Sequence, residues 1–340
     1  MTTPQRKIEH IHHILSDAEI DRSGKYFDQI QLIHRALPEI NMEDVSLRHI
    51  FLGKEVEMPL LISSMTGGED PILMEINQNL AKAAQQQGVA LGVGSQRVAI
   101  ESKKARESFL LRSYAPTIPL LANMGAVQLN RGFGLEEAQV MVDMLEADAL
   151  ILHLNPLQEA IQPEGDRCFK GLADRMHQLV SRLPVPVIVK EVGCGFSADD
   201  LRLLNEVGVK WIDTAGKGGT SWSRVEAHRG SWDLGLAFQD WGMSTPQVLK
   251  LAKACCPDIH LIASGGIRSA QDMIKALILG AQMAALAKPF LSPAMQSQDA
   301  VVQVIENLKR EFKVGMFLLG QTQISKLIGN ELLIASERKA

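Results

Sequence analysis

Several side chains able to bind a metal or a substrate lie together in segment 153–159, which reads HLNPLQE. The segment contains one imidazole, His153, and one carboxylate, Glu159, with the amides of Asn155 and Gln158 between them. A single carboxylate is too few for a metal site made only of protein ligands, but Mg²⁺ retains waters and takes one or two carboxylates together with substrate phosphates. Glu159 is therefore a candidate magnesium ligand. Taken alone, His153 is more typical of a hydrogen-bonded core histidine.

A phosphate-binding loop is indicated by segment 264–268, which reads SGGIR. Its two glycines allow backbone N–H groups to approach an anion, and the helix predicted to follow adds its positive end. Lys288, further along the chain, could supply a second charge to the same phosphate. The alternative is a tight turn that serves packing alone.

Lys190 ends the apolar stretch 187–189, where its side chain would face a buried environment. An unpaired buried ammonium is costly, so this lysine needs an anionic partner. A flavin ring that carries negative charge when reduced would serve. A salt bridge to Glu191 or Glu159 is the alternative.

Two other segments offer polar groups with less specific patterns. The basic residues Arg6, Lys7 and His10 near the start fit a second anion, although short basic clusters are usually solvated. Segment 218–222, which reads GGTSW, offers flexible backbone and two hydroxyls, but a linker has the same composition.

These residues follow eight short apolar runs that alternate with amphipathic stretches from residue 58 onward. The runs are rich in Val, Ile, Leu or Ala without strict alternation, which is typical of parallel strands covered on both faces. Eight such units favour a closed (β/α)₈ barrel, or TIM barrel, within the α/β class. We expect the strands at 60–64, 89–93, 118–122, 149–154, 185–190, 210–213, 260–264 and 282–287.

In a barrel the active site lies where the carboxyl ends of the strands open on one face, and phosphate often binds after the last two strands. The polar residues above should therefore converge on one mouth. Residues 1–57 form an N-terminal extension, and residues 215–245 form a long loop after the sixth strand. Helices are expected between the strands at 74–87, 136–145, 171–183, 199–207, 246–255 and 270–279.

The composition restricts the class of protein. The net charge is −4, and no sustained basic run appears, which argues against nucleic acid as a partner. No window offers ~18 consecutive apolar residues, so we expect no membrane span. The four cysteines form no CxxC, which suits neither a disulfide framework nor a zinc site. Since the polar start also lacks a signal peptide, we expect a cytoplasmic protein.

Together these motifs resemble type 2 isopentenyl-diphosphate isomerase, an FMN-dependent family, from residue 6 to about residue 290. Two departures from the family pattern are Ile8, where an acidic residue is common, and Lys288, where arginine is more usual. The motifs that carry the resemblance are Arg6-Lys7-x-x-His10, Met65-Thr66-Gly67-Gly68, Gly94-Ser95-Gln96-Arg97, Asn123-Met124-Gly125, His153-x-Asn155-Pro156-x-Gln158-Glu159, Lys190-Glu191, Gly218-Gly219-Thr220-Ser221-Trp222 and Ser264-Gly265-Gly266-Ile267-Arg268.

The resemblance implies an FMN-binding barrel at 58–340 and an extension at 1–57 that contributes to the substrate site. The residues expected around FMN are Met65, Thr66, Gly67, Ser95, Asn123, Lys190, Thr220, Gly266, Ile267, Arg268, Ala287 and Lys288. Those expected to hold substrate are Arg6, Lys7, His10, Ser95, Gln96, Arg97, His153, Asn155 and Gln158.

The activity implied is interconversion of isopentenyl and dimethylallyl diphosphate, with reduced FMN as acid and base. Glu159 would bind Mg²⁺ on the diphosphate, and Gln158 is the side chain expected to orient or relay a proton. NADPH would serve as the reductant, and the family forms homotetramers or homo-octamers.

Other functions on the same barrel require different residues. A 2-hydroxy acid oxidase needs a histidine base beside an arginine, for which His228 and Arg229 in the long loop are the candidates. An IMP dehydrogenase-like enzyme needs a cysteine after the sixth strand, and none lies between Cys194 and Cys255. A catalytically silent flavin- or phosphate-binding regulator remains an alternative of another class.

Overall fold

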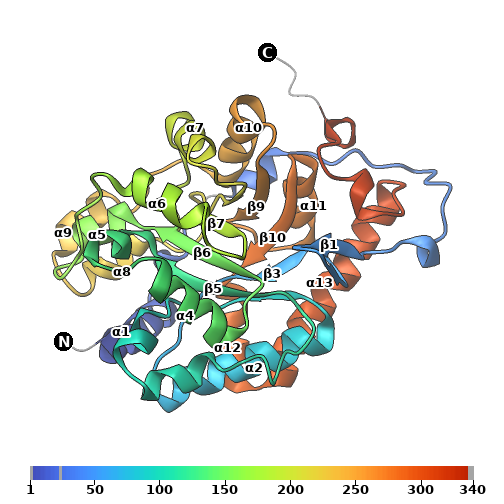
Figure 1. Ribbon diagram of the computed structural model, residues 1–340. Helices are drawn as coiled ribbons and strands as arrows, with labels where there is room; N and C mark the ends of the chain where they lie inside the picture. Colours follow the sequence, from blue (N-terminus) through green and yellow to red (C-terminus); the bar gives the residue numbers. More distant parts are fainter. Residues whose placement is uncertain (1–2, 23–24, 336–340) are drawn as a thin grey trace.

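The computed structural model describes residues 3–22 and 25–335, so the outermost residues of the extension and of the barrel segment lie outside the described part. Eight parallel strands close into a barrel in the order β10-β3-β4-β5-β6-β7-β8-β9, with helices around it (Figure 1). The predicted TIM barrel is confirmed. The strands are β3 (Leu60–Ile62), β4 (Ala90–Gly92), β5 (Leu120–Gly125), β6 (Ala149–Leu154), β7 (Val187–Glu191), β8 (Trp211–Asp213), β9 (His260–Ser264) and β10 (Ala281–Leu286).

Local signals explain where the surrounding helices begin and end. Asp70 caps the first barrel helix by accepting a 2.9 Å hydrogen bond from the Ile72 amide, and Gly88 ends it in the left-handed conformation at φ 63°. At the start of another helix, the Ser197 hydroxyl accepts a hydrogen bond from the Asp200 amide. The helices are α2 (Pro71–Gln87), α3 (Arg97–Glu101), α4 (Leu135–Leu145), α5 (Pro156–Ile161), α6 (Leu172–Val180), α7 (Ala198–Glu206), α10 (Thr245–Cys255), α11 (Ala270–Ile278), α12 (Lys288–Gln296) and α13 (Gln298–Leu318).

The strand register determines which polar groups reach the mouth of the barrel. Ile151 pairs with Ile188, and both belong to the buried cluster inside the barrel. Two residues further along the same strands, His153 pairs with Lys190. Because side chains on one face of a strand repeat every second residue, His153 and Lys190 point inward, one layer above the apolar interior.

A hairpin that the sequence analysis did not predict closes the opposite end of the barrel. It consists of β1 (His49–Phe51) and β2 (Lys54–Val56) within the N-terminal extension. Phe51 and Val56 are each 1% exposed and join the apolar cluster inside the barrel. The Phe51 ring contacts Trp211 of β8 edge-on, with 5.3 Å between centroids. The barrel therefore opens at its carboxyl end.

The rest of the extension reaches that carboxyl end. Its helix α1 (Thr3–Ser16) contacts α8 (Trp222–Ala227), which lies with α9 (Trp232–Ala237) in the segment expected to be a long loop. Arg22, following α1, donates to the carbonyls of Gly193 at 2.6 Å and Gly219 at 3.1 Å. The leader, meaning residues 3–22, is thereby fastened beside the mouth. No helix in the described ranges has the length and apolar character needed to cross a bilayer.

Candidate active site

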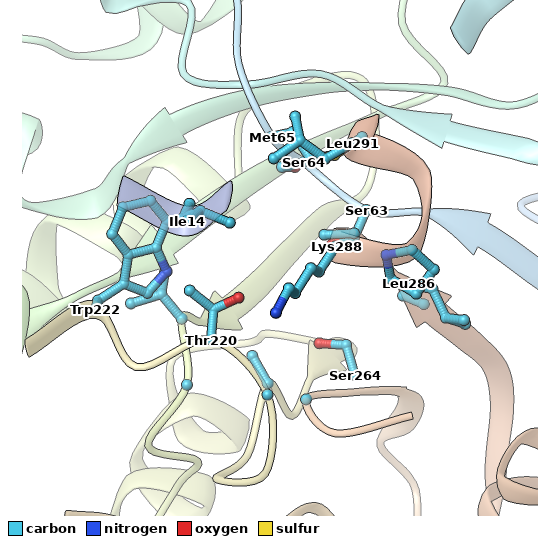
Figure 2. Close-up of a pocket in the computed structure, with 18 of the residues that line it drawn as sticks. Ile14, Ser63, Ser64, Met65, Thr220, Trp222, Ser264, Leu286, Lys288 and Leu291 are labelled. Carbon is cyan, nitrogen blue, oxygen red and sulfur yellow. The ribbon is translucent and has the colours of Figure 1, made fainter. Parts of the chain in front are cut away.

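A cavity of about 370 Å³ lies at the mouth, between the leader and the strand ends. Figure 2 shows Lys288, Thr220 and Ser264 reaching into the same space, with Trp222 and Ile14 on one side. Predicted site residues that line this cavity are Lys7, His10, Met65, Thr66, Lys190, Thr220, Gly266, Ile267, Arg268, Ala287 and Lys288. They comprise most of the predicted FMN set and two of the predicted substrate residues.

The loops after β8 and β9 meet backbone to backbone at one end of the cavity. Gly265 has φ 91°, and a Cβ atom there would lie 2.0 Å from the Gly216 carbonyl oxygen. Gly266 has φ 76°, and a Cβ atom there would lie 2.8 Å from the Gly218 carbonyl carbon. Only glycine tolerates both the left-handed backbone and this close approach. The SGGIR segment thus exposes backbone beside Arg268, as a phosphate loop requires.

Arg268 and Lys288 converge on one leader carboxylate at this end. The Arg268 Nη2 atom lies 2.8 Å from Asp21 Oδ1, and the Lys288 Nζ atom lies 3.1 Å from Asp21 Oδ2. Arg268 also donates to the carbonyls of Gly266 and Gly218. The two cations predicted to bind phosphate are therefore close enough to hold one anion.

Lys190 lies at the floor of the cavity beside two buried polar residues. Its Nζ atom donates to the Glu191 carbonyl at 2.7 Å. Burial lowers the pKa of Lys190, while the charges of Asp213 and Glu191 raise it. Asp213 accepts from the Ser264 hydroxyl, and burial raises the pKa of Asp213. A lysine side chain with so little exposure to solvent favours an anionic or strongly polar ligand.

Two hydroxyls on the cavity wall form no hydrogen bond with the described part of the chain. The Ser64 Oγ and Thr66 Oγ1 atoms are buried without a hydrogen bond to any residue that the structure describes. Buried polar groups are normally satisfied, so both are available to a ligand. Together with Lys190 and the cationic end, this donor set fits the carbonyl-bearing ring and the phosphate of FMN.

A second cationic region lies beside the cavity. Lys7 Nζ donates to the carbonyl oxygens of Gly67 and, at 3.4 Å, Ser95. Burial, and then the charges of Arg6 and Arg97, lower the pKa of Lys7 to about 7. Burial and Arg97 also lower the pKa of Arg6. The charges of neighbouring cations destabilise the charged forms of Arg6 and Lys7, which indicates a site for a multiply charged anion.

The 153–159 segment forms a connected polar cluster near this region. The Asn155 amide donates at 3.0 Å to both Gln158 Oε1 and Glu159 Oε1. Gln158 in turn donates at 2.9 Å to Oε1 of Glu226, which is fully buried on α8. Asn155 Oδ1 is buried without a partner among the described residues and remains an available acceptor.

His153 and Gln96 hold the neighbouring strand β5. The His153 Nδ1 atom lies 2.8 Å from Asn123 Oδ1, and burial, Lys190 and Arg97 lower the pKa of His153 to about 3. The imidazole is therefore neutral. Gln96 is fully buried, with its amide bonded to the Asn123 backbone and the Met141 carbonyl. These contacts occupy Gln96 in positioning Asn123, which also donates to the Val93 carbonyl.

Glu226 is the main site residue that the sequence analysis missed. The His10 ring lies between it and Trp222, with 3.0 Å from Nε2 to Glu226 Oε1 and 5.2 Å between the ring centroids of His10 and Trp222. Burial acts to raise the pKa of Glu226, but contacts with His10 and Gln158 lower it below its ordinary value. Trp222 and Glu226 are four residues apart, a helical spacing that could have identified them as one face.

The residues considered for a hydroxy acid oxidase bind carboxylates of the leader instead. His228 lies 2.8 Å from Asp17 Oδ2 and stacks on His13 at 4.5 Å. Arg229 contacts Glu9 at 3.1 Å and Glu226 at 2.7 Å. Both residues therefore serve to dock the leader on α8, which speaks against a base–arginine pair for a hydroxy acid.

Sequence comparison identifies similar proteins over nearly the whole chain. A family model described as FMN-dependent dehydrogenase matches residues 2–116 and 153–334. Isopentenyl-diphosphate delta-isomerase from Hydrogenovibrio crunogenus is 53% identical, with 97% of each chain covered. Proteins of the same name from Paracoccus zeaxanthinifaciens and a Nostoc species are 49% and 47% identical, covering 97% and 96% of this chain and 96% and 94% of theirs.

Solved structures share the fold at much lower identity. A flavocytochrome b2 variant with pyruvate bound superposes with a TM-score of 0.70 at 17% identity, covering 96% of this chain and 82% of that one. A mandelate oxidase variant with benzaldehyde gives 0.64 at 15% identity, covering 96% of both chains. At these identities the likeness shows the barrel fold alone.

Proposed function

We propose that this chain, which belongs to the type 2 isopentenyl-diphosphate isomerases within the FMN-dependent dehydrogenase family, interconverts isopentenyl diphosphate and dimethylallyl diphosphate. The relatives that carry this name align with 96–97% of the chain. We therefore propose for this chain the activity that their name describes. FMN is the cofactor of the family whose model matches.

The observation that carries the proposal is the presence of two separate cationic regions around one cavity. Arg268 and Lys288 lie at one end, beside the glycine loop. Lys7 lines the same cavity, with Arg6 and Arg97 beside it and close enough to lower its pKa. FMN and an isoprenoid diphosphate each bring one strongly anionic group, and two such ligands account for both regions.

When bound, reduced FMN supplies an acid–base group and an electron-rich ring that can face positive charge. The chain's own residues orient the substrate. Arg6, Lys7 and Arg97 hold the diphosphate, and neutral His153 and the free Asn155 Oδ1 offer hydrogen bonds. Gln158, which donates a hydrogen bond to Glu226, is our proposed side chain for positioning or relaying the proton at the allylic carbon.

Glu159 would hold Mg²⁺ on the diphosphate. Its Oε1 atom accepts from Asn155, and its Oε2 atom accepts from the Asp166 backbone amide, which fixes the carboxylate. Within residues 3–22 and 25–335 no three His, Cys, Asp or Glu side chains gather into a metal cage. A cation at Glu159 would therefore depend on phosphate oxygens and waters, as Mg²⁺ prefers.

Two further parts of the proposal concern the reductant of the cofactor and the oligomeric state of the enzyme. NADPH is the proposed reductant of FMN, with no net redox change in each turnover. The proposed assembly is a homotetramer or homo-octamer, which light scattering on purified protein would measure. A monomer in that measurement would contradict the assembly.

The experiment that tests the function compares oxidised and chemically reduced FMN holoenzyme with Mg²⁺ and isopentenyl diphosphate, following dimethylallyl diphosphate by NMR. We expect conversion only with reduced flavin. Equal conversion with fully oxidised flavin would exclude the acid–base role, and no conversion in either state would exclude the isomerase. Oxygen-dependent consumption of a 2-hydroxy acid by the same preparation would favour the oxidase alternative.

A further inference from the structure

Asp21 of the leader occupies an unusual place, since it is a carboxylate at the end of the cavity proposed for a phosphate. It lines the cavity together with Gly265, Gly266, Arg268 and Lys288. Its two oxygens divide between the cations, Oδ1 on Arg268 at 2.8 Å and Oδ2 on Lys288 at 3.1 Å. One carboxylate thus bridges both side chains that the sequence assigns to phosphate.

The backbone around Asp21 holds this carboxylate in place. Asp21 forms an isolated antiparallel bridge with Thr220, itself on the cavity wall. On either side of it, the Ser221 amide donates to the Ile20 carbonyl at 2.8 Å and the Arg22 amide donates to the Gly219 carbonyl at 3.1 Å. The position of the carboxylate is therefore fixed by backbone hydrogen bonds to the loop after β8 as well as by its own ion pairs.

We propose that Asp21 is an internal counterion that competes with the phosphate of FMN for Arg268 and Lys288. The inference rests on the proposed binding of FMN with its phosphate at this end. A phosphate monoester carries up to two negative charges and three acceptor oxygens, so it displaces a carboxylate that offers one charge and two. A flavin without a phosphate leaves the ion pairs intact.

Arg268 and Lys288 select the phosphorylated cofactor, and competition from Asp21 reduces the preference for FMN over a flavin without phosphate. Any flavin gains the ring contacts at Lys190, Ser64 and Thr66, but only one that carries a phosphate gains Arg268 and Lys288. The cost of displacing Asp21 is modest, because its side chain is 28% exposed and the cations are 35% and 31% exposed. Exposed ion pairs of this kind are weak and screened by salt.

The test measures FMN and riboflavin affinity of flavin-free wild type and of Asp21→Asn by quenching of flavin fluorescence. Removing the competing charge should tighten FMN binding by about 3- to 30-fold, the range expected for two partly exposed ion pairs. Riboflavin affinity should stay unchanged. The gain should shrink as the salt concentration rises. Asp21→Ser, which removes the charge with a smaller side chain, should give the same tightening.

Asp28→Asn is the matched control, because Asp28 is an exposed aspartate of the same extension. It should bind both flavins as the wild type does. Equal FMN binding by both Asp21 variants would overturn the competition, and weaker binding would show that Asp21 positions the cations instead. An equal gain for riboflavin would also overturn it. Failure of the wild type to bind either flavin would instead contradict the proposed function.

Discussion

The Nε2 atom of His10 lies 3.0 Å from Oε1 of Glu226, which joins the leader helix to the helix after β8 across the active-site mouth. The same Glu226 oxygen accepts the Gln158 amide at 2.9 Å. A leader residue and the proposed proton-handling amide therefore share one buried carboxylate. Because both depend on it, Glu226 couples docking of the leader to orientation of Gln158.

Replacing Glu226 with glutamine should lower kcat about 100-fold, a loss typical of disturbed proton handling. Glutamine keeps the size of the side chain but removes the charge that Gln158 and Arg229 bind. Flavin affinity should be unchanged, since Glu226 is not a lining residue of the cavity. Steady-state kinetics with flavin titration measures both, and Glu136→Gln, at an exposed position of α4, is the control. A fall in flavin affinity with normal kcat would contradict this role.

Lys7 should make pyrophosphate binding dependent on pH. Its pKa is lowered to about 7, so near pH 7 the free protein is only partly protonated there. An anion beside Lys7 raises that pKa again, so binding takes up protons, and affinity should fall as pH rises above about 7. Calorimetry in buffers of different ionisation enthalpy measures the uptake. In Lys7→Gln the protein's share of the proton uptake should disappear, and uptake identical to wild type would rule out this assignment.

Glu159→Gln should weaken the dependence on Mg²⁺ while flavin stays bound. Loss of a residue that only hydrogen-bonds to a metal ligand typically lowers metal affinity by about 10- to 100-fold. Loss of a direct ligand should therefore lower the apparent metal affinity by at least about 10-fold. Activity titrated with Mg²⁺ gives the metal affinity, and the flavin absorption of the purified variant gives cofactor retention. Loss of flavin with an unchanged response to Mg²⁺ would reverse the assignment.

Asp213 and Lys190 should be energetically coupled in the cavity floor. Both are buried and paired in strand register, and the Asp213 charge raises the pKa of Lys190. Asp213→Asn leaves a buried lysine without its carboxylate and should lower the free energy of unfolding by about 3 kcal/mol. In urea denaturation, the double variant with Lys190→Met should lose less than the sum of the two single variants. Additive losses would show that the two side chains act independently.

The barrel was predictable because its eight strands are buried on both faces. Each therefore appears as an apolar run such as 185–190, and β7 overlaps this run at Val187–Glu191. The hairpin β1–β2 was not predicted, since the charged residues Lys54 and Glu55 in β2 give the segment a polar composition. Two short helices in segment 215–245 were missed because six residues each are too few for a clear periodic pattern.

Apart from Arg6, Lys7 and His10 on α1, the site residues predicted from motifs lie at or near strand ends, where local sequence carries the signal. Asp21 has no such signal, and Glu226 has only its helical spacing from Trp222. Glu226 is identified by its contacts with His10 and Gln158, and Asp21 by its contacts with Arg268 and Lys288. These partners lie far away in the chain, so only the folded arrangement of leader and barrel reveals them.

The hairpin that closes the amino end of the barrel affects the route by which ligands could enter and leave. Phe51 and Val56 fill that end, and the cavity lies at the opposite end beside the leader. If the flavin and the substrate bind there as proposed, both would enter from the carboxyl end, and the deeper ligand would have to bind first.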